Sequence, residues 1–563
     1  MLKQLLLKSF VIKRISKKRC LKRNRPDWTP IIEKDKTAWG DALKKEKKKK
    51  VLIATSVGAY LPGTIIESLL SVALTLRDTE VHVLLCDFPL PACFFCNIQV
   101  TISTNELLHC EISKKLCTFC RQNGNQVFEQ LGLPIHWYSQ YINRIEEIEH
   151  TAEKLFSTIP LDQFGDFSYN GLPIGQHAMA GAFRFFAIGD IQFEKHGPDV
   201  LLKFFKSSFI IASMMENLLK KNSFDCVVVH HGIYVPMGII GEVCRKNNVR
   251  IVNWNPAYRK HCFIFSHNNS YHFTLMNESD EYWKTLPWTP GMENKIMEYL
   301  KSRRCGTFDW IWFHENPTED ITSIEKKIGI DFSKPVIGML TNVIWDAQLH
   351  FNESIFSNMV NWVIETIRYF ANRPDLQLLI RVHPAEIRGT LKSRQLLIPE
   401  IKKHFNKLPP NIFIIPPESN SSTYAAMEKC NSVIIYGTKT GIELASLGIP
   451  IIVGGEAWVR NKGITLDASS PEEYFNYLDR LPFKDPMDQD TIHTARKYAY
   501  HFFLRRMIPI HSLTVRKGWP PYLLSVTSLD ELAPGSDPGL DVICNGILDN
   551  KPFIYPAELE LED

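Results

Sequence analysis

Three side chains that can bind a phosphate or move a proton lie together at the end of one expected strand. Arg381, His383 and Glu386 occupy the end of the strand predicted over 376–382 and the turn after it. Pro384 ends that strand, because it has no N–H and disfavours a helical conformation at the residue before it. In open α/β sheets, ligands bind outside the carboxyl ends of the strands. A cation, an imidazole and a carboxylate at such a place indicate a phosphorylated ligand, and a surface turn with ordinary charges is the alternative.

A second loop of this kind covers residues 437–443, between the expected strand 432–435 and a helix. Backbone N–H groups at a helix start favour an anion, and Lys439 and its two flanking threonines can add donors. The loop is not a P-loop, because its glycines lack the G-x-x-x-x-G-K-[ST] spacing. Glu443 could reach a ribose hydroxyl, although the helix dipole alone would also explain an acid at this position.

His231 is the predicted general base. It follows the buried strand expected over 226–229 and stands beside Gly232. A histidine at the carboxyl end of a strand, next to a glycine and an aromatic residue, lies where a base can work, because histidine is the side chain that most often changes charge near neutral pH. The alternative is a histidine that only hydrogen-bonds the backbone of a tight turn.

A cysteine-rich stretch carries a different chemistry. Two C-x-x-C pairs, separated by twenty residues, match the spacing of a structural zinc site. The metal would substitute for a core that so short an insertion cannot build. Cys86 and Cys110 lie in the same stretch, so that an iron–sulfur cluster is an alternative, as are buried or redox-active thiols. The expected metal ligands are Cys93, Cys96, Cys117 and Cys120.

Alternating strands and helices must position these residues. A strand over 51–55, a helix over 65–76 and a strand over 80–86 form a β-α-β unit, and the same alternation restarts at 335. We therefore expect an α/β protein with two doubly wound, Rossmann-like parallel sheets facing a cleft. No redox nucleotide is expected, because the first turn offers only Gly58 and Gly63 and no G-x-G-x-x-G.

Four segments follow from this alternation. We expect a basic N-terminal arm and linker over 1–50, and an acceptor-side domain over 51–330 that contains the cysteine-rich insertion 86–122. A nucleotide-sugar-binding domain would cover 331–483, and a crossing helix at 489–505 with an irregular tail would complete 484–563. The arm could form a cationic amphipathic helix on an anionic membrane surface; a solvated tail and a transit peptide are the alternatives.

Composition narrows the class of protein. The chain has 563 residues, 45% hydrophobic and 22% charged, and its net charge of +4 comes from the N-terminal arm. Such a balance argues against nucleic acid as the main partner. The sequence shows neither a membrane span nor a secretory signal, and its 13 cysteines are then those of a reducing compartment. We expect a cytoplasmic protein, with the arm able to hold it at the cytoplasmic face of a membrane.

Residues 335–480 resemble the GT-B glycosyltransferases of bacterial capsular polysaccharide biosynthesis. The segments that carry the resemblance are Arg-Val-His-Pro-Ala-Glu at 381–386 and the run from Gly437 to Val453. The first half is similar at 86–93 and 231–234. The resemblance implies that the His-Pro segment and the Gly-Thr helix start hold a sugar nucleotide, and that no metal is essential at the reaction centre.

The expected activity is transfer of a sugar from a nucleotide-sugar donor to a glycan, polysaccharide or lipid-linked acceptor. A sugar-nucleotide epimerase and a non-catalytic, two-lobed binding or scaffold protein are the alternatives. The residues expected to bind the donor are Asn342, Arg381, His383, Glu386, Thr438, Lys439, Thr440, Gly441 and Glu443.

Overall fold

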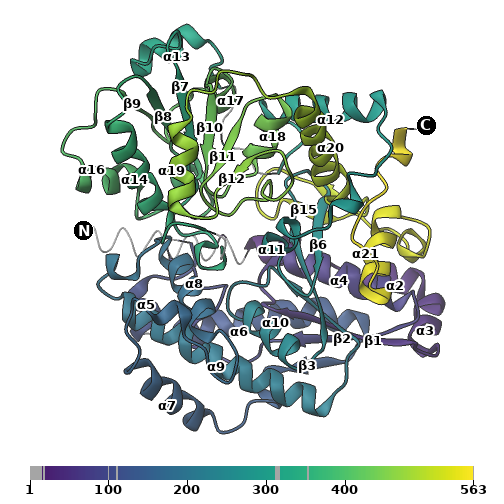
Figure 1. Ribbon diagram of the computed structural model, residues 1–563. Coiled ribbons are helices and arrows are strands. Elements are labelled where there is room, and N and C mark those ends of the chain that lie inside the picture. Colours follow the sequence, from purple (N-terminus) through teal and green to yellow (C-terminus); the bar gives the residue numbers. More distant parts are fainter. Residues whose placement is uncertain are drawn as a thin grey trace. The chain divides into compact units, whose positions relative to one another are not determined.

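The chain forms two compact units, each built around its own sheet (Figure 1). The computed structural model describes residues 16, 19–98, 100–109, 112–310, 313, 317–351 and 354–561. The first unit takes in the described residues up to Phe186, Asp190–Tyr271 and Met507–Tyr555; the second takes in Ala187–Gly189, His272–Arg506 and the described residues from Pro556 on.

The first unit has a seven-stranded sheet in the order β13-β6-β5-β4-β1-β2-β3. Strands β1 to β5 run parallel, and β6 and β13 add antiparallel pairs at one edge. The strand order reverses between β1 and β4, which is the topological switch point where such sheets bind ligands. The strands are β1 (Lys49–Ser56), β2 (Thr79–Leu85), β3 (Ile135–Trp137), β4 (Cys226–His230), β5 (Arg250–Pro256), β6 (Cys262–His267) and β13 (Ile508–Pro509).

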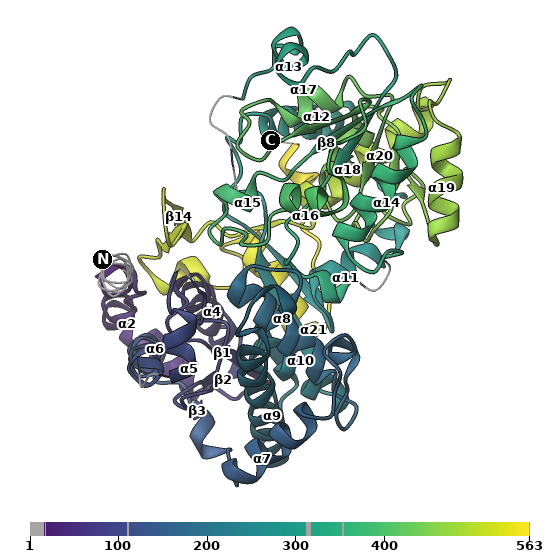
Figure 2. The same cartoon turned by 90° about the vertical axis from the view of Figure 1, so that its left-hand side faces the viewer.

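Helices cover both faces of this sheet (Figure 2). On one face, Trp254 of β5 donates a hydrogen bond to Glu67 of α4 (Leu61–Thr75) over 3.1 Å. Side chains alternate between the faces of a strand, so Ile251 points to the other face, where it packs beside α10 (Met237–Lys246). The long α9 (Gly197–Lys221) packs against α10 and against α8 (Ile174–Phe186).

The second unit has a six-stranded parallel sheet in the order β12-β11-β10-β7-β8-β9. Its switch point lies between β7 and β10. The central strands are buried on both faces, as their uninterrupted apolar runs predict. The strands are β7 (Val336–Leu340), β8 (Gln377–Arg381), β9 (Ile412–Ile415), β10 (Ser432–Ile435), β11 (Ile451–Val453) and β12 (Leu466–Asp467). The doubly wound α/β architecture predicted for both halves is thus present.

The chain passes between the units earlier than the predicted boundary at 330. It enters the second unit at His272, so α12 (Pro290–Arg303) belongs to that unit, where it packs against α20 (Gln489–Tyr500). Helices without intervening strands carry no alternation, which is why the sequence pattern did not locate this passage.

The tail is more regular than predicted. A helix is present where the crossing helix was expected, as α20 and a π-helical turn, His501–Arg505, and both lie within the second unit. The chain then returns to the first unit, where β13 pairs with β6 and α21 (Pro538–Asp549) lies against α4. A hairpin of β14 (Leu513–Val515) and β15 (Tyr522–Leu524) lies between them in sequence. The prediction of an irregular end was therefore wrong for these segments.

Two further expectations concern the first 122 residues. The cysteine-rich stretch is not a separate insertion, because α5 (Thr104–His109) and α6 (Ile112–Phe128) are the crossover that joins β2 to β3. Of the basic arm, residues 29–34 and 36–44 form α2 and α3. The predicted amphipathic helix of the arm falls largely on residues outside the described ranges. Cys110, an alternative metal ligand, also lies outside them. Within the described ranges, every helix is too short or too polar to span a lipid bilayer.

Candidate functional site

The carboxyl ends of β7, β8 and β10 form one continuous surface in the second unit. Asn342, after β7, donates a hydrogen bond from Nδ2 to the carbonyl of Gly437, after β10, over 3.0 Å. The N–H of His383, after β8, donates to Thr341 Oγ1 over 3.1 Å. The three loops predicted to converge are thus joined across the switch point, where an α/β sheet binds its ligand.

Arg381 is turned into this unit. Its side chain is only 2% exposed and donates from Nη1 to the carbonyl of Pro416 over 2.7 Å and from Nε to Thr423 Oγ1 over 3.1 Å. Burial lowers its pKa to about 10. The guanidinium therefore braces the segment after β9, and a contact with a donor phosphate would need these bonds to change.

His383 and Glu386 have different environments. His383 Nδ1 accepts the N–H of Ala385 over 3.1 Å, so the neutral ring carries its proton on Nε2 and can donate it. Glu386 is buried and accepts the N–H of Leu397 over 3.0 Å, at the start of α16 (Leu397–His404). Burial raises the pKa of Glu386 to about 7. Of the two, the half-buried His383 is placed as a hydrogen-bond donor and Glu386 as a structural anchor.

The Gly-Thr loop opens α18 (Thr440–Ser446), a helix of seven residues. A Cβ at Gly441 would lie 2.6 Å from Ile435 Cδ1, so this glycine lets α18 pack on β10. Thr438 Oγ1 accepts the N–H of Thr440 over 3.3 Å. Because the helix is short and one of its first N–H groups has a partner, the helix dipole contributes less here than the sequence suggested.

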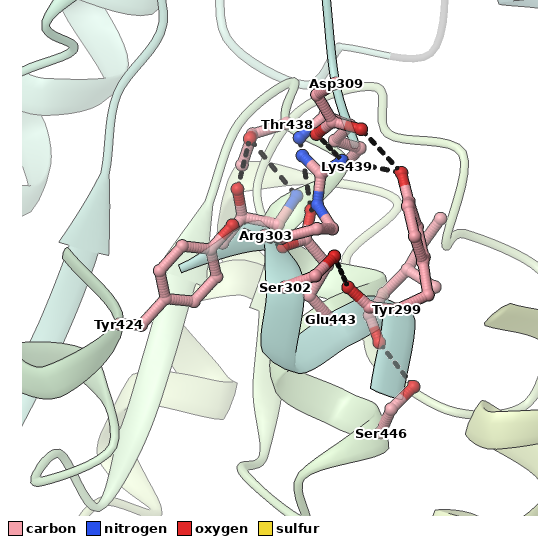
Figure 3. A network of polar contacts seen from close by, with 11 residues as sticks. Tyr299, Ser302, Arg303, Asp309, Tyr424, Thr438, Lys439, Glu443 and Ser446 are labelled. Carbon is pink, nitrogen blue, oxygen red and sulfur yellow. Dashed lines mark hydrogen bonds and ion pairs between the residues drawn. The ribbon is translucent and has the colours of Figure 1, made fainter. Parts of the chain in front are cut away.

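Glu443 is the centre of a buried ionic network (Figure 3). It is 1% exposed, and its Oε1 lies 3.0 Å from Arg303 Nε and 3.1 Å from Lys439 Nζ. Tyr424 donates its hydroxyl to Oε2 over 2.5 Å. Burial raises the pKa of Glu443, but the ion pairs with Arg303 and Lys439 outweigh it and hold that pKa at about 2. Arg303 also pairs with Asp309.

This network was not foreseen from the sequence. Arg303 and Asp309 lie in the stretch 260–330, which shows no repeat of strands, and no local pattern links them to residue 443. Two cations face two carboxylates, so the cluster is balanced in charge. Its effect is to fix Lys439 beside the strand-end surface, while the predicted contact of Glu443 with a ribose stays a prediction.

In the first unit, His231 follows β4 at the switch point, as predicted. Its backbone is left-handed, with φ of +64°, and its N–H donates to the carbonyl of Trp254 over 3.0 Å. The ring packs on Tyr234, with 4.8 Å between ring centroids. Burial lowers the pKa of the neighbouring His230 to about 3, so His230 stays neutral. The position suits a base, and the role itself stays a prediction.

Asn253 is a polar residue beside His231 that sequence reasoning missed. Its side chain is 2% exposed, and neither amide atom has a hydrogen-bond partner among the described residues. It lies next to Gly232, where an added Cβ would stand 2.2 Å from Asn253 Oδ1. An amide offers both a donor and an acceptor, which suits a hydroxyl-rich ligand. Its place inside an apolar strand hid it from pattern reading.

The predicted zinc site is not confirmed. In the part of the chain that the structure describes, no three His, Cys, Asp or Glu side chains are grouped closely enough to hold one metal ion. Cys117 and Cys120 lie within α6, so only the pair Cys93 and Cys96 forms the tight turn expected of a zinc knuckle.

The sequence matches no protein-family model and no curated protein. The fold is similar to several solved structures at 12% sequence identity. The β-Kdo 2,4-transferase KpsC of Thermosulfurimonas dismutans aligns over 49% of this chain and 79% of its own, with a TM-score of 0.32. Sucrose-phosphate synthase of Thermosynechococcus elongatus aligns over 80% of this chain and 94% of its own, with a TM-score of 0.30. A UDP-GlcNAc 2-epimerase of Neisseria meningitidis bound to UDP-GlcNAc aligns over 80% of this chain and 97% of its own, with a TM-score of 0.23. Glycosyltransferases are thus among the similar structures, but TM-scores this low carry no conclusion about activity.

Proposed function

We propose that this chain is a glycosyltransferase whose second unit binds a nucleotide-sugar donor. One observation carries the proposal: the loops after β7, β8 and β10 meet at the switch point and are hydrogen-bonded to one another through Asn342, Gly437 and His383. Donors of two kinds lie on these loops, an imidazole with its proton on Nε2 and the hydroxyls of Thr438 and Thr440. A diphosphate is an acceptor-only group that needs such donors.

The chemistry follows from charge. When the glycosidic bond to a nucleotide breaks, negative charge grows on the departing diphosphate, and preorganised donors stabilise it. Lys439, held by Glu443 at the start of α18, supplies a fixed positive charge near those donors. His231 of the first unit is the proposed base that takes the proton of the attacking hydroxyl.

The donor site is tested with His383→Ala. Binding of a panel of UDP-, GDP- and CMP-sugars to the full chain would be measured by thermal shift and calorimetry. Loss of one hydrogen bond to a charged group should weaken the donor that binds by about tenfold or more. His404→Ala removes an exposed histidine of the same unit and is the matched control, which should bind as the wild type does. Equal affinity for both variants would remove His383 from the donor site.

Turnover separates the proposed activity from its alternatives. A transferase releases nucleotide only when an acceptor is present, and His231→Asn should cut that rate by about a hundredfold with little effect on donor binding. An epimerase interconverts sugar nucleotides without an acceptor. A binding protein does neither, and binding without any conversion would overturn the proposal.

A further inference from the structure

Five cysteines line a single pocket in the first unit. The pocket lies beyond the carboxyl ends of β1 and β2. Its other lining residues are Ser56 and apolar side chains, such as Val57, Leu90 and Leu116. A hollow lined by thiols and hydrocarbon, with no carboxylate or cation among its described lining residues, suits a ligand that prefers sulfur. The five are Cys86, Cys93, Cys96, Cys117 and Cys120.

One of the sulfurs receives a backbone N–H group. The N–H of Ala59 donates to Cys120 Sγ over 3.3 Å. A neutral thiol is a weak acceptor, whereas a thiolate is stabilised by such peptide dipoles. This hydrogen bond ties the turn after β1 to the sulfur of Cys120, although burial raises the pKa of that thiol.

The fold brings these sulfurs together from two segments, the stretch after β2 and α6, beside the turn after β1. The turn after β1 packs so closely on α6 that a Cβ at Gly58 would lie 2.6 Å from the carbonyl of Cys120 and from Gly124 Cα. Asn123 ties the two together by donating to the carbonyl of Gly58 over 2.5 Å. Cys117 and Cys120 are three residues apart and so lie on one face of α6. This packing holds α6 against the turn that receives a phosphate in dinucleotide-binding folds.

We propose that this pocket binds a thiophilic metal centre through the thiolates of Cys93, Cys96, Cys117 and Cys120. Among the described residues, no three metal-binding side chains lie close enough together to hold one metal ion. The thiols therefore surround the pocket without forming a preformed site for a single ion. The metal either draws the side chains inward as one zinc ion or fills the hollow as an iron–sulfur cluster, with the same thiolate ligation in both cases. Cys86 is a fifth thiol within the same pocket. The centre would fasten the segment after β2 to α6, which packs on the turn after β1, and it does not depend on the proposed transfer reaction.

Metal analysis of the full chain tests the proposal. Protein purified without oxygen should contain about one equivalent of zinc, or several of iron with acid-labile sulfide and a visible absorption band. Iron and sulfide together identify the cluster, and zinc alone identifies the single ion. Metal below about a tenth of an equivalent, or a disulfide between Cys93 and Cys96 in that preparation, would overturn it.

Variants locate the ligands. Cys93→Ser and Cys120→Ser should each lower the metal content at least about fivefold, whereas Cys305→Ser, at an exposed thiol of the second unit, should not. Because a ligand variant can also misfold, wild-type protein stripped of its metal is reconstituted with cobalt(II), a single ion that the four thiolates can bind. Thiolate-to-cobalt charge-transfer bands support the site, and cobalt that binds without them contradicts it.

Discussion

At the scale of single residues, Glu443 decides the charge balance of the second unit's site. Its buried carboxylate faces two partly buried cations, Arg303 and Lys439. Glu443→Gln keeps the shape and removes the charge, so both cations lose their shared partner. Breaking a buried ion pair from one side costs about 3–5 kcal/mol, and we expect a loss in that range. The measurement is pulsed hydrogen exchange of β7 and β10 peptides through the urea transition.

The control for this variant is Glu472→Gln, which removes the charge of an exposed carboxylate in the first turn of α19 (Pro471–Asp479). It should change the urea midpoint little, because helix-dipole effects at exposed sites are worth less than about 1 kcal/mol. Equal midpoints for the two variants would show that the Glu443 network does not hold the unit together.

A second buried carboxylate, Glu67, should make the first unit sensitive to pH. Burial raises its pKa to about 7, despite the hydrogen bond from Trp254. The folded state therefore binds this proton more tightly than the unfolded state does. Stability from this group is complete below the unfolded pKa and is lost as pH rises from about 4.5 to about 7. Glu67→Gln, which still accepts from Trp254, should leave stability nearly unchanged at pH 4.5.

At pH 8 the same variant should be more stable than the wild type by about 2–3 kcal/mol, because no carboxylate has to ionise inside the unit. Urea unfolding of β1 at the two pH values measures both differences. If the free energies of unfolding of the wild type and the variant changed with pH in the same way over this range, Glu67 would not be the titrating group.

Sequence reasoning located several site residues without seeing where their side chains point. Arg381, Glu386 and Glu443 all stand after strands of the second unit, as the apolar runs and turn residues predicted. Their partners, among them Pro416, Leu397 and Arg303, come from segments that no local pattern connects to them. Inward or outward orientation depends on this long-range packing, which makes these residues internal anchors, and their contacts with a ligand stay predictions.

At the scale of elements, the close approach of α6 to the turn after β1 depends on Gly58. Gly58→Ala would place a methyl group 2.6 Å from backbone atoms of Cys120 and Gly124, so the helix has to move. We expect a loss of about 1–3 kcal/mol in the stability of the first unit. Gly40→Ala in α3 (Lys36–Lys44) meets nothing within 4 Å and should gain about 0.5–1 kcal/mol from helix propensity. Changes of opposite sign in the free energy of unfolding of the two variants, measured in urea, support this packing. A Gly58→Ala variant as stable as the wild type contradicts it.

The elements themselves were predictable where the apolar pattern is strong. The runs at 226–229, 336–340 and 432–435 are strands, because an uninterrupted apolar segment is stable only when both of its faces are covered. The pattern failed for the cysteine-rich stretch. Zinc-like spacing predicted an insertion with two tight turns, but one C-x-x-C pair lies within α6, whose helical structure comes from its packing as a crossover between β2 and β3.

At the scale of the whole molecule, alternation of strands and helices predicted two doubly wound units but not which segments complete them. The first sheet gains its edge strand β13 from residues that lie more than 200 positions after β6. Pairing over such a distance is determined by the backbone edge of β6, which would otherwise lack a neighbouring strand. A strand of only two residues, such as β13, shows no recognisable pattern in the sequence. The passage at residue 271 was missed for a similar reason, because α12 joins the second unit through contacts with α20.

The C-terminal segment should therefore be required by the first unit although it follows the second in sequence. Arg250 of β5 donates from Nη1 to the carbonyl of Gly546 over 3.0 Å, and Arg77 Nη2 lies 2.5 Å from Asp541 of α21. Ending the chain after Arg506 removes β13 and α21 and leaves both arginines without these partners. We expect hydrogen-exchange protection of β5, β6 and α4 to fall to that of an unfolded chain, because a buried edge and two paired cations are lost together. Ending the chain after Tyr555 keeps these contacts and is the control. If β5 and β6 stayed protected in the shorter chain, the C-terminal segment would be an appendage and not part of the first unit.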